Sequence, residues 1–360
     1  MKKRVAGIMR IKNEGMFVEG CIESCIDALD ELIVVYNDCT DNTAEEVGKM
    51  PAKYPDKIRQ YEYPYEVEAF NLTREQFEKV KAYPEGNPHL FSTYSNFALS
   101  KVTADYVVKI DADQIYFTEI LKYWCDFMRE CEPQKMGIKT LAGKIFSFYL
   151  SGYRWLSLKS GRVLPIMPSW LLKVAYPVYL SYAKYAFSHD IACMSLSGVN
   201  VLETDRMLIS MGHESDILLM LSPFNGVGDT VMFKLSDKTY FQKVVMDAYN
   251  KEDATSFIVA EEFVHPYPKV TYIGYFWKHI RTMRPGILEA ALKAYEKDPK
   301  AFVSVEEFKK KSFKDLIRES PRTIFVLYHQ ILFNFVYKAN KKKLIAELEK
   351  NQISKIDNAK

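Results

Sequence analysis

Two aspartates, Asp111 and Asp113, follow directly after the apolar run at residues 107–110. Side chains alternate along a strand, so the two carboxylates would share one side and are free to converge on an ion where the strand ends. Carboxylates are hard oxygen ligands that suit Mg²⁺ or Mn²⁺, and these ions bridge to phosphate oxygens. The pair therefore predicts a metal site that could hold a diphosphate leaving group. The alternative is an acidic turn that caps a buried strand.

Alternating strand and helix patterns surround this pair. The early apolar runs predict strands at residues 4–11, 31–36 and 58–63, with helices at 16–29 and from residue 40 between them. Such alternation is typical of a doubly wound, mostly parallel sheet, which binds ligands beyond the carboxyl ends of its strands. Three polar turns sit at those ends, at residues 12–15, 37–41 and 111–114. We expect these turns to converge on one crevice.

The pattern becomes less regular further along the chain. Helices are predicted at residues 73–82, 92–101 and 118–131, and further strands at 105–110 and 136–142. After Gly286 the sequence predicts helices to the end.

Residues 145–188 are dense in aromatic side chains and carry only basic charges. This segment could be a lid that binds an acceptor, an amphipathic surface that faces a membrane, or a buried aromatic core.

Charge is distributed unevenly along the 360 residues, although the net charge is only +3. Residues 271–360 hold 19 Lys and Arg against 10 Asp and Glu, whereas the first 270 hold 30 against 36. A basic end on an acidic body favours an anionic partner, either lipid or nucleic acid, unless it is a solvated helical face. No nucleic-acid-binding motif is present. The apolar stretch 324–337 beside lysines 341–343 therefore predicts peripheral contact with an anionic membrane.

The six cysteines form no CxxC pair, and the first residues do not resemble a secretory signal. No run approaches the ~20 apolar residues that a membrane-spanning helix needs. We therefore expect reduced thiols, no structural zinc, and a cytoplasmic protein that contacts the inner membrane face at most peripherally.

Four segments, in this order, resemble the nucleotide-sugar-dependent glycosyltransferases of the GT-A fold, and most closely family 2 of that group. They are the strand end at residues 10–14, the turn at 37–43, the helix and strand at 95–107, and Asp111-Ala112-Asp113 at the position of the family's DxD motif. The resemblance extends over residues 4–265. It implies an α/β GT-A fold, with a mostly parallel central sheet flanked by helices and a helical C-terminal extension.

The resemblance also assigns roles to these residues. Asp113 would bind the divalent ion, Mn²⁺ or Mg²⁺, and Asp111 would contact the donor ribose or the metal. Base recognition would fall to Asn37 or Asp38, because Asn37 stands where the family usually has an aspartate. Asn13 and Asn96 complete the predicted donor-binding residues. A UDP-sugar is the expected donor.

The catalytic base is expected near residues 226–230, where the family commonly has a Glu-Asp pair. Glycine replaces that glutamate, so Asp229 is the candidate base, with a helix N-cap as its competing role. Glu214 and Asp216 are the reserve candidates. His265 sits where the family often has a third metal ligand, and it could equally be structural. Lys278, His279, Arg281 and Arg284 could instead face the diphosphate.

These assignments predict an inverting, metal-dependent glycosyltransferase that acts on a glycan or glycolipid hydroxyl in surface polysaccharide or lipooligosaccharide synthesis. Residues 1–270 would form the catalytic domain, divided at residue 115 into nucleotide-sugar-binding and acceptor-binding halves, and residues 271–360 would form the helical, basic region. A sugar nucleotidyltransferase and a non-catalytic relative that keeps the fold for binding are the alternatives.

Overall fold

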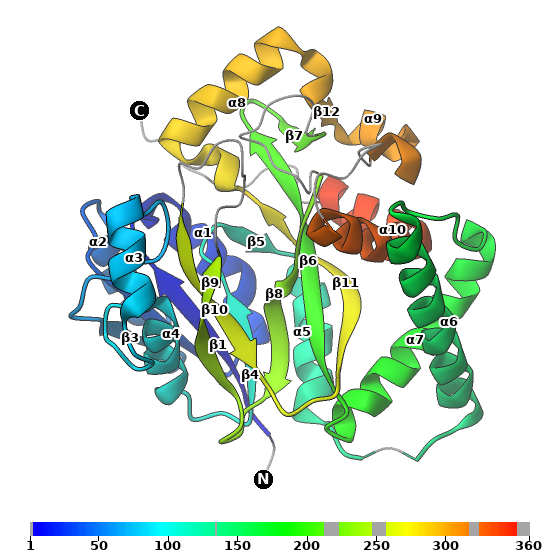
Figure 1. The fold of residues 1–360 in the computed structure, drawn as a ribbon, viewed down its shortest axis with the longest axis horizontal. Coiled ribbons are helices and arrows are strands. Elements are labelled where there is room, and N and C mark those ends of the chain that lie inside the picture. Colours follow the sequence, from blue (N-terminus) through cyan, green and yellow to red (C-terminus); the bar gives the residue numbers. More distant parts are fainter. Residues whose placement is uncertain (1–2, 134, 212–222, 247–256, 317–323, 351–360) are drawn as a thin grey trace. The chain divides into compact units, whose positions relative to one another are not determined.

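The computed structural model describes residues 3–133, 135–211, 223–246, 257–316 and 324–350 (Figure 1). The chain forms two compact units, and both are discontinuous in sequence. The first unit contains Met1–Ala112, Lys122–Glu130 and Phe233–Tyr267, and the second contains Asp113–Leu121, Cys131–Met232 and Pro268–Lys360. The domain division expected from the sequence follows other boundaries and stays a prediction.

A parallel sheet forms the centre of the first unit. Its strands are β1 (Val5–Ile11), β2 (Glu31–Tyr36), β3 (Ile58–Glu62) and β4 (Tyr106–Ile110), in the spatial order β4-β1-β2-β3. All three neighbouring pairs are parallel. Strands β1 and β2 are almost entirely buried, as expected for apolar runs that helices cover on both faces.

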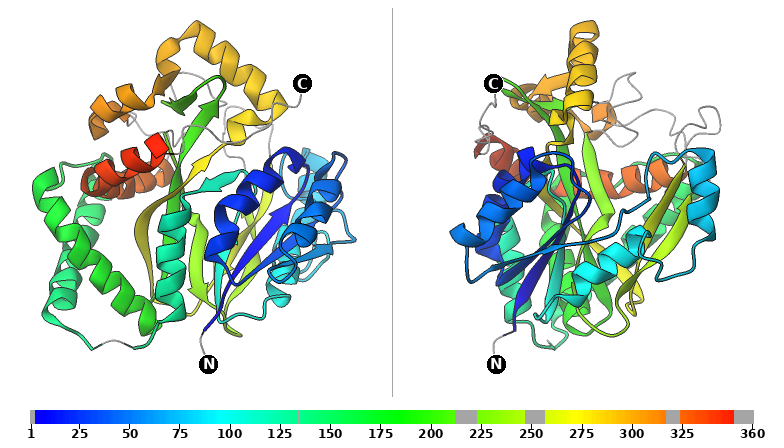
Figure 2. Two further views of the ribbon diagram at one scale, coloured as in Figure 1. Left: turned by 180° about the vertical axis from the view of Figure 1, so that it is seen from behind. Right: turned by 90° about the vertical axis from the view of Figure 1, so that its left-hand side faces the viewer.

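Helices cover both faces of this sheet. Figure 2 shows α1 (Gly15–Cys25) and α2 (Thr43–Lys53) on one face and α4 (Phe91–Ser100) on the other. Helix α3 (Arg74–Ala82) begins with a capping box formed by Thr73 and Gln76. The hairpin of β9 (Tyr240–Met246) and β10 (Ile258–Val264) packs on α4. A 3₁₀ turn (Ile26–Ala28) follows α1, and α5 (Thr118–Arg129) begins in the second unit and continues in the first.

The second unit is built around β6 (Ala192–Glu203), whose 12 residues are all buried. Strand β6 pairs in parallel with β11 (Lys269–His279) and antiparallel with β7 (Met207–Ser210) and β8 (Phe224–Lys234). Strand β11 in turn pairs antiparallel with the short β5 (Gln114–Tyr116), and β12 (Phe302–Ser304) pairs with β7. The long β6 is therefore the central strand of this sheet.

Helices complete the second unit. They are α6 (Ile138–Ser160), α7 (Ser169–Ser188), α8 (Pro285–Lys297), α9 (Val305–Lys310) and α10 (Ile324–Lys350), with 3₁₀ turns at Arg281–Met283, Pro299–Ala301 and Phe313–Leu316. Helices α6 and α7 form a hairpin whose backbones come very close at Gly143, where an added Cβ would lie 2.0 Å from the carbonyl oxygen of Val178. The predicted strand at residues 136–142 is wrong, because α6 begins at Ile138.

The predicted fold class is confirmed: this is an α/β protein with a parallel central sheet flanked by helices and a helical C-terminal segment. In the apolar stretch 324–337, the structure describes the side chains from residue 327 onward, and most of the apolar ones are buried. Its side chains Ile331, Phe333, Phe335 and Val336 are buried in the second unit, so they serve as core. Among the described residues, no helix combines the length and apolarity needed to cross a membrane.

Candidate active site

The carboxylate of Asp113 lies in a cluster of cationic side chains in the second unit. Its Oδ2 accepts a hydrogen bond from Arg284 Nη2 at 2.9 Å and lies 3.4 Å from His279 Nε2. The pairing of β5 with β11 produces this approach, because it sets Gln114 opposite His279, and the Ile280 N–H donates to the Asp113 carbonyl oxygen at 2.9 Å.

The cationic neighbours decide the ionisation of Asp113, whose exposed fraction is only 6%. Burial acts to raise the pKa of this carboxyl, but the positive charges of His279, Arg284 and Arg281 outweigh burial and hold the pKa well below its usual range. Asp113 is therefore a buried, ionised carboxylate at neutral pH. A group of this kind can hold a divalent cation, and the surrounding arginines can bind phosphate oxygens.

His279 is oriented by Asn200. Its Nδ1 lies 2.7 Å from Asn200 Oδ1, and the register of β6 with β11 sets the two residues side by side. Because an amide oxygen only accepts, this contact places the Nδ1 proton toward Asn200 and leaves Nε2 facing Asp113. An imidazole held in this way could bind a cation through Nε2 once that nitrogen gives up its proton, in the orientation that hydrogen-bonded metal-site histidines adopt.

Lys278, which the sequence placed with His279 toward a diphosphate, does not share that side chain's surroundings. It is buried, and its Nζ lies 2.6 Å from Glu203 Oε1. Successive side chains on β11 point to opposite faces, so Lys278 and His279 cannot both face Asp113. Arg284, by contrast, lies beside Asp113, and its contact with a diphosphate stays a prediction.

In the first unit, the turns after β1 and β2 come together as predicted. The Thr40 N–H donates to Asn13 Oδ1 at 2.7 Å, and Lys12 Nζ lies 2.6 Å from Asp38 Oδ2. Asn13 and Asp38 have φ angles of 55° and 43°, in the left-handed region that asparagine and aspartate tolerate best after glycine. The two turns therefore form one polar edge of the sheet.

Two of the predicted donor-binding asparagines join segments of the first unit. The buried amide of Asn37 donates from Nδ2 to the Tyr65 carbonyl oxygen at 3.2 Å. The Asn96 side chain pairs with the backbone of Phe241 at both ends, at 2.7 and 2.8 Å, and so links α4 to β9. The Asn37 amide thus fixes the chain after β3 and the Asn96 amide joins a helix to the β9–β10 hairpin, and their contact with a donor stays a prediction.

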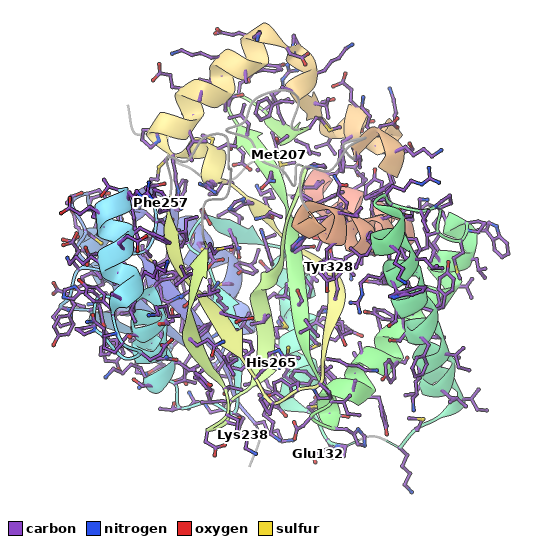
Figure 3. All side chains as sticks on the ribbon, in the orientation of Figure 1. Glu132, Met207, Lys238, Phe257, His265 and Tyr328 are labelled. Carbon is purple, nitrogen blue, oxygen red and sulfur yellow. The ribbon has the colours of Figure 1, made fainter. Side chains whose placement is uncertain are left out.

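Asp111 and His265 belong to the first unit, and the structure does not bring them together. Asp111 follows the carboxyl end of β4, where its carbonyl oxygen accepts from Cys21 Sγ at 3.4 Å. His265 lies toward the amino end of β4, because Tyr267 Oη donates to the Lys234 carbonyl oxygen and the neighbouring Leu235 N–H donates to Asp105. The five residues of β4 separate these ends by roughly 17 Å. Figure 3 shows His265 at the same end of the first unit as Lys238.

His265 lies among aromatic side chains, and its role as a metal ligand stays a prediction. Its ring stacks on Tyr267 with centroids 5.4 Å apart, and burial lowers its pKa, so the imidazole is neutral. No hydrogen-bond partner of its buried Nδ1 lies among the described residues.

The candidate base Asp229 lies in strand β8, so the prediction that it begins a helix is wrong, and the competing N-cap role no longer applies. The glycines before Asp229 are part of this extended strand, with Gly226 at φ 100°. The side chain of Asp229 lies outside the described residues, as do the reserve candidates Glu214 and Asp216.

Sequence reasoning missed the role of Asn200, which orients His279, and of His279 as the imidazole nearest to Asp113. At Gly198 an added Cβ would lie 2.1 Å from Trp277 Nε1, so this glycine makes room for the indole. The described residues contain no cluster of three or more His, Cys, Asp or Glu side chains that could enclose a metal ion. The donor set that the second unit offers is one carboxylate oxygen and one imidazole nitrogen, which suits Mn²⁺ better than Mg²⁺.

Residues 4–130 match a protein family described as beta-1,4-N-acetylgalactosaminyltransferase (CgtA). The match includes Asp111, Asp113 and the turns after β1 and β2, and it covers about a third of the chain. It confirms the predicted resemblance to nucleotide-sugar-dependent glycosyltransferases and the prediction of an enzyme of the transferase class. No curated protein matches the chain.

Solved structures of glucosyl-3-phosphoglycerate synthase from Mycobacterium tuberculosis are similar to a short part of the chain. The complex with Mn²⁺, UDP and phosphoglyceric acid is 22% identical, and the complex with Mg²⁺ and UDP is 23% identical. Each similarity covers 31% of this chain and 34% of the other, with a TM-score of 0.19. The chain therefore spans about a third of the length of these proteins, and a TM-score this low carries no inference about its site.

Proposed function

We propose that the protein transfers a sugar from a nucleoside diphosphate, with UDP as the nucleotide, to a hydroxyl of a glycan or glycolipid, with inversion at the anomeric carbon. One observation carries the proposal: Asp113, inside the segment that matches a glycosyltransferase family, is a buried ionised carboxylate held among His279, Arg281 and Arg284. That combination suits the binding of a metal diphosphate, in which the carboxylate and imidazole bind the cation and the arginines bind phosphate oxygens.

In this mechanism Asp113 Oδ2 and His279 Nε2 would hold Mn²⁺ or Mg²⁺, with Mn²⁺ favoured by the imidazole. A bound divalent ion would neutralise the charge that develops on the departing diphosphate. Asn200 would keep the Nδ1 proton of His279 in place, so that loss of the Nε2 proton on metal binding would leave the Nε2 lone pair for the cation. Arg284, freed from Asp113 once the carboxylate binds a cation, would pair with the diphosphate.

The remaining roles are proposals on the family resemblance. The turns of the first unit that contain Asn13, Asn37 and Asp38, together with Asn96 and Asp111, would recognise the nucleoside. Asp229 would take the proton of the attacking acceptor hydroxyl. The acceptor would belong to a surface polysaccharide or lipooligosaccharide, and the enzyme would act at the cytoplasmic face of the membrane.

The test is Mn²⁺-dependent hydrolysis of nucleotide sugars, beginning with UDP-N-acetylgalactosamine because of the family description, then other UDP-, GDP- and CMP-sugars. We expect Asp113→Asn to lower the rate at least about a hundredfold, because removal of a charge-stabilising group in an active site typically costs this much. Asp237→Asn, the same change in an exposed turn, is the matched control and should keep the wild-type rate.

Substitution of His279 and of His265 tests which of the two histidines binds the metal. His279→Gln should raise the Mn²⁺ concentration needed for half-maximal activity by more than Asn200→Ala, for which about ten- to a hundredfold is expected. His265→Gln should leave it unchanged.

Three outcomes would reject parts of this proposal. A wild-type rate in Asp113→Asn would exclude the metal clamp at this carboxylate. Metal-dependent donor binding without any turnover would indicate a binding protein. Release of pyrophosphate from a nucleoside triphosphate and a sugar phosphate would indicate a nucleotidyltransferase.

A further inference from the structure

One face of the α6–α7 hairpin belongs to the core of the second unit. The Phe335 ring of α10 lies 5.7 Å from Phe146 of α6 and 5.2 Å from Tyr179 of α7, measured between ring centroids. The guanidinium of Arg154 lies 5.6 Å from the centroid of Tyr328, which Figure 3 labels on α10. On this side, side chains of the hairpin pack against α10.

The opposite face of the hairpin is also apolar, and it is exposed. On α6 it consists of Ile138, Leu141, Ile145, Phe148 and Trp155, which recur at three- and four-residue intervals for most of the sequence and so occupy about a third of the helix circumference. On α7, the other helix of the hairpin, Trp170 and Val174 are also exposed. We call these seven residues the apolar face.

The size of the exposed side chains makes this face unusual for a surface in water. Ile138 is 90% exposed, Trp170 68% and Phe148 61%. A helix that packs on one side of a protein normally presents a polar side to water, whereas α6 is apolar on both sides. Contiguous exposed apolar side chains of this size mark a surface that another apolar phase or molecule covers.

The charges of the hairpin identify what covers it. Between residues 133 and 189 the sequence has eight Lys and Arg and no Asp or Glu. The ammonium of Lys159 lies 4.4 Å from the centroid of the Trp155 ring, and Lys144 and Lys173 also lie on these two helices. Long basic side chains can lie along an apolar surface while their charges reach outward. Exposed aliphatic and tryptophan side chains on a hairpin whose only charged residues are cations fit the interface of a bilayer with anionic headgroups.

We infer that the apolar face docks on an anionic membrane, with the two tryptophans at the headgroup level and Lys144, Lys159 and Lys173 on lipid phosphates. This location differs from the one expected at residues 324–337, where Ile331, Phe333, Phe335 and Val336 are core. The inference uses no property of the donor site, so it stands or falls separately from the proposed transferase activity.

Tryptophan fluorescence tests the inference at the residues concerned. The chain has four tryptophans, of which Trp124 and Trp277 are buried, while Trp155 and Trp170 lie on the apolar face. We expect vesicles of phosphatidylcholine with phosphatidylglycerol to shift the emission of the full-length protein to the blue. The shift should disappear in Trp155→Phe with Trp170→Phe, although this variant still sediments with the vesicles.

Co-sedimentation with the same vesicles measures the energetics. Replacing Phe148, Trp155 and Trp170 by serine should weaken binding at least about tenfold, because each loses its apolar insertion. The matched control replaces two exposed side chains elsewhere, Tyr123 and Leu292, by serine and should bind as wild type. Circular dichroism confirms that each variant is folded.

Charge reversal provides the second measurement. Lys159→Glu with Lys173→Glu should weaken vesicle binding by about fivefold or more for each charge lost, whereas the same reversal at the exposed Lys297 and Lys300 of the α8 end should have little effect.

Equal binding by the serine variant and the wild type, or equal binding to vesicles of phosphatidylcholine alone, would overturn the inference. So would a dimer in solution that the serine variant abolishes while vesicle binding is absent. That result would assign the apolar face to a second copy of the chain.

Discussion

The buried ion pair of Arg10 and Glu261 should be a main determinant of the stability of the first unit. Arg10 Nη1 lies 2.5 Å from Glu261 Oε1, with exposed side-chain fractions of 4% and 8%. The Ser95 hydroxyl contacts both partners, and the guanidinium lies 4.8 Å from the centroid of Phe91. Glu261 is on β10 and Arg10 on β1, so the pair fastens the β9–β10 hairpin to the central sheet.

Removal of the buried Glu261 carboxylate should lower the stability of the protein far more than removal of a carboxylate from the surface would. Burial acts to lower the pKa of Arg10, but the charge of Glu261 outweighs it and raises the pKa, so the guanidinium stays charged at every accessible pH. Glu261→Ala therefore leaves a buried cation without its main carboxylate partner. Breaking a buried pair in this way costs about 3–5 kcal/mol in the free energy of unfolding.

Urea unfolding followed by circular dichroism measures this loss, with a control in the neighbouring residue. Glu262→Ala removes an exposed carboxylate on the same strand and should change the free energy of unfolding by no more than about 0.5 kcal/mol. Arg10→Met with Glu261→Leu should be closer to wild type than Glu261→Ala, because the buried guanidinium is removed together with its carboxylate and only Lys109, whose Nζ lies 3.8 Å from Glu261 Oε1, loses a partner.

A loss below about 1 kcal/mol in Glu261→Ala would show that water reaches the guanidinium and would refute this reasoning. A double variant as unstable as the sum of its single changes would refute it as well, because independent changes add and coupled ones do not.

Two further stability predictions follow from local geometry. Gly143→Val should force α6 and α7 apart, because a Cβ there meets the Val178 carbonyl oxygen at 2.0 Å, and should cost about 1–3 kcal/mol or more in thermal unfolding, whereas Gly152→Ala, with no atom near its added Cβ, should be neutral or slightly stabilising. Burial acts to raise the pKa of Asp41, but hydrogen bonds from the backbone and a side chain outweigh it and lower the pKa. Asp41 therefore stabilises the fold above its unfolded-state pKa of about 3.9, and this contribution is lost as the pH falls through the folded-state value. Asp41→Asn should be less stable than the wild type at pH 7 and equal to it in strong acid, while a pH-independent difference would contradict the assignment.

The sequence predicted the elements of the first unit closely because local signals determine them. The runs at 31–36 and 58–63 became β2 and β3, and the pattern at 73–82 became α3, which its capping box starts at Arg74. Apolar strands that end in polar turns are readable without knowing their partners. The strand predicted at 136–142 failed because a short apolar run also fits the first turn of a helix, and nothing local distinguishes the two.

The candidate site could be predicted only in part, for a physical reason. Asp111 and Asp113 could be placed because they adjoin the strand that positions them. The approach of His279 to Asp113 depends on the pairing of β5 with β11, and the orientation of His279 by Asn200 depends on the pairing of β11 with β6. Such pairings join residues far apart in the sequence, and no periodicity within either strand specifies them. His265 could be proposed from its position in the sequence, but it lies toward the opposite end of β4 from Asp111.

The residues around Asp113 differ in whether the family match includes them. The family match ends at residue 130 and contains Asp113, but Asn200, His279 and Arg284, which surround that carboxylate, all lie beyond it. The metal-binding carboxylate would thus be a shared feature, while the groups that set its charge and orient its imidazole neighbour come from the second unit. The same unit carries the apolar face of the α6–α7 hairpin. If both proposals hold, the groups around the diphosphate and the surface that meets the membrane belong to one compact unit, so a lipid-linked acceptor would be presented by the same part of the protein that stabilises the leaving group.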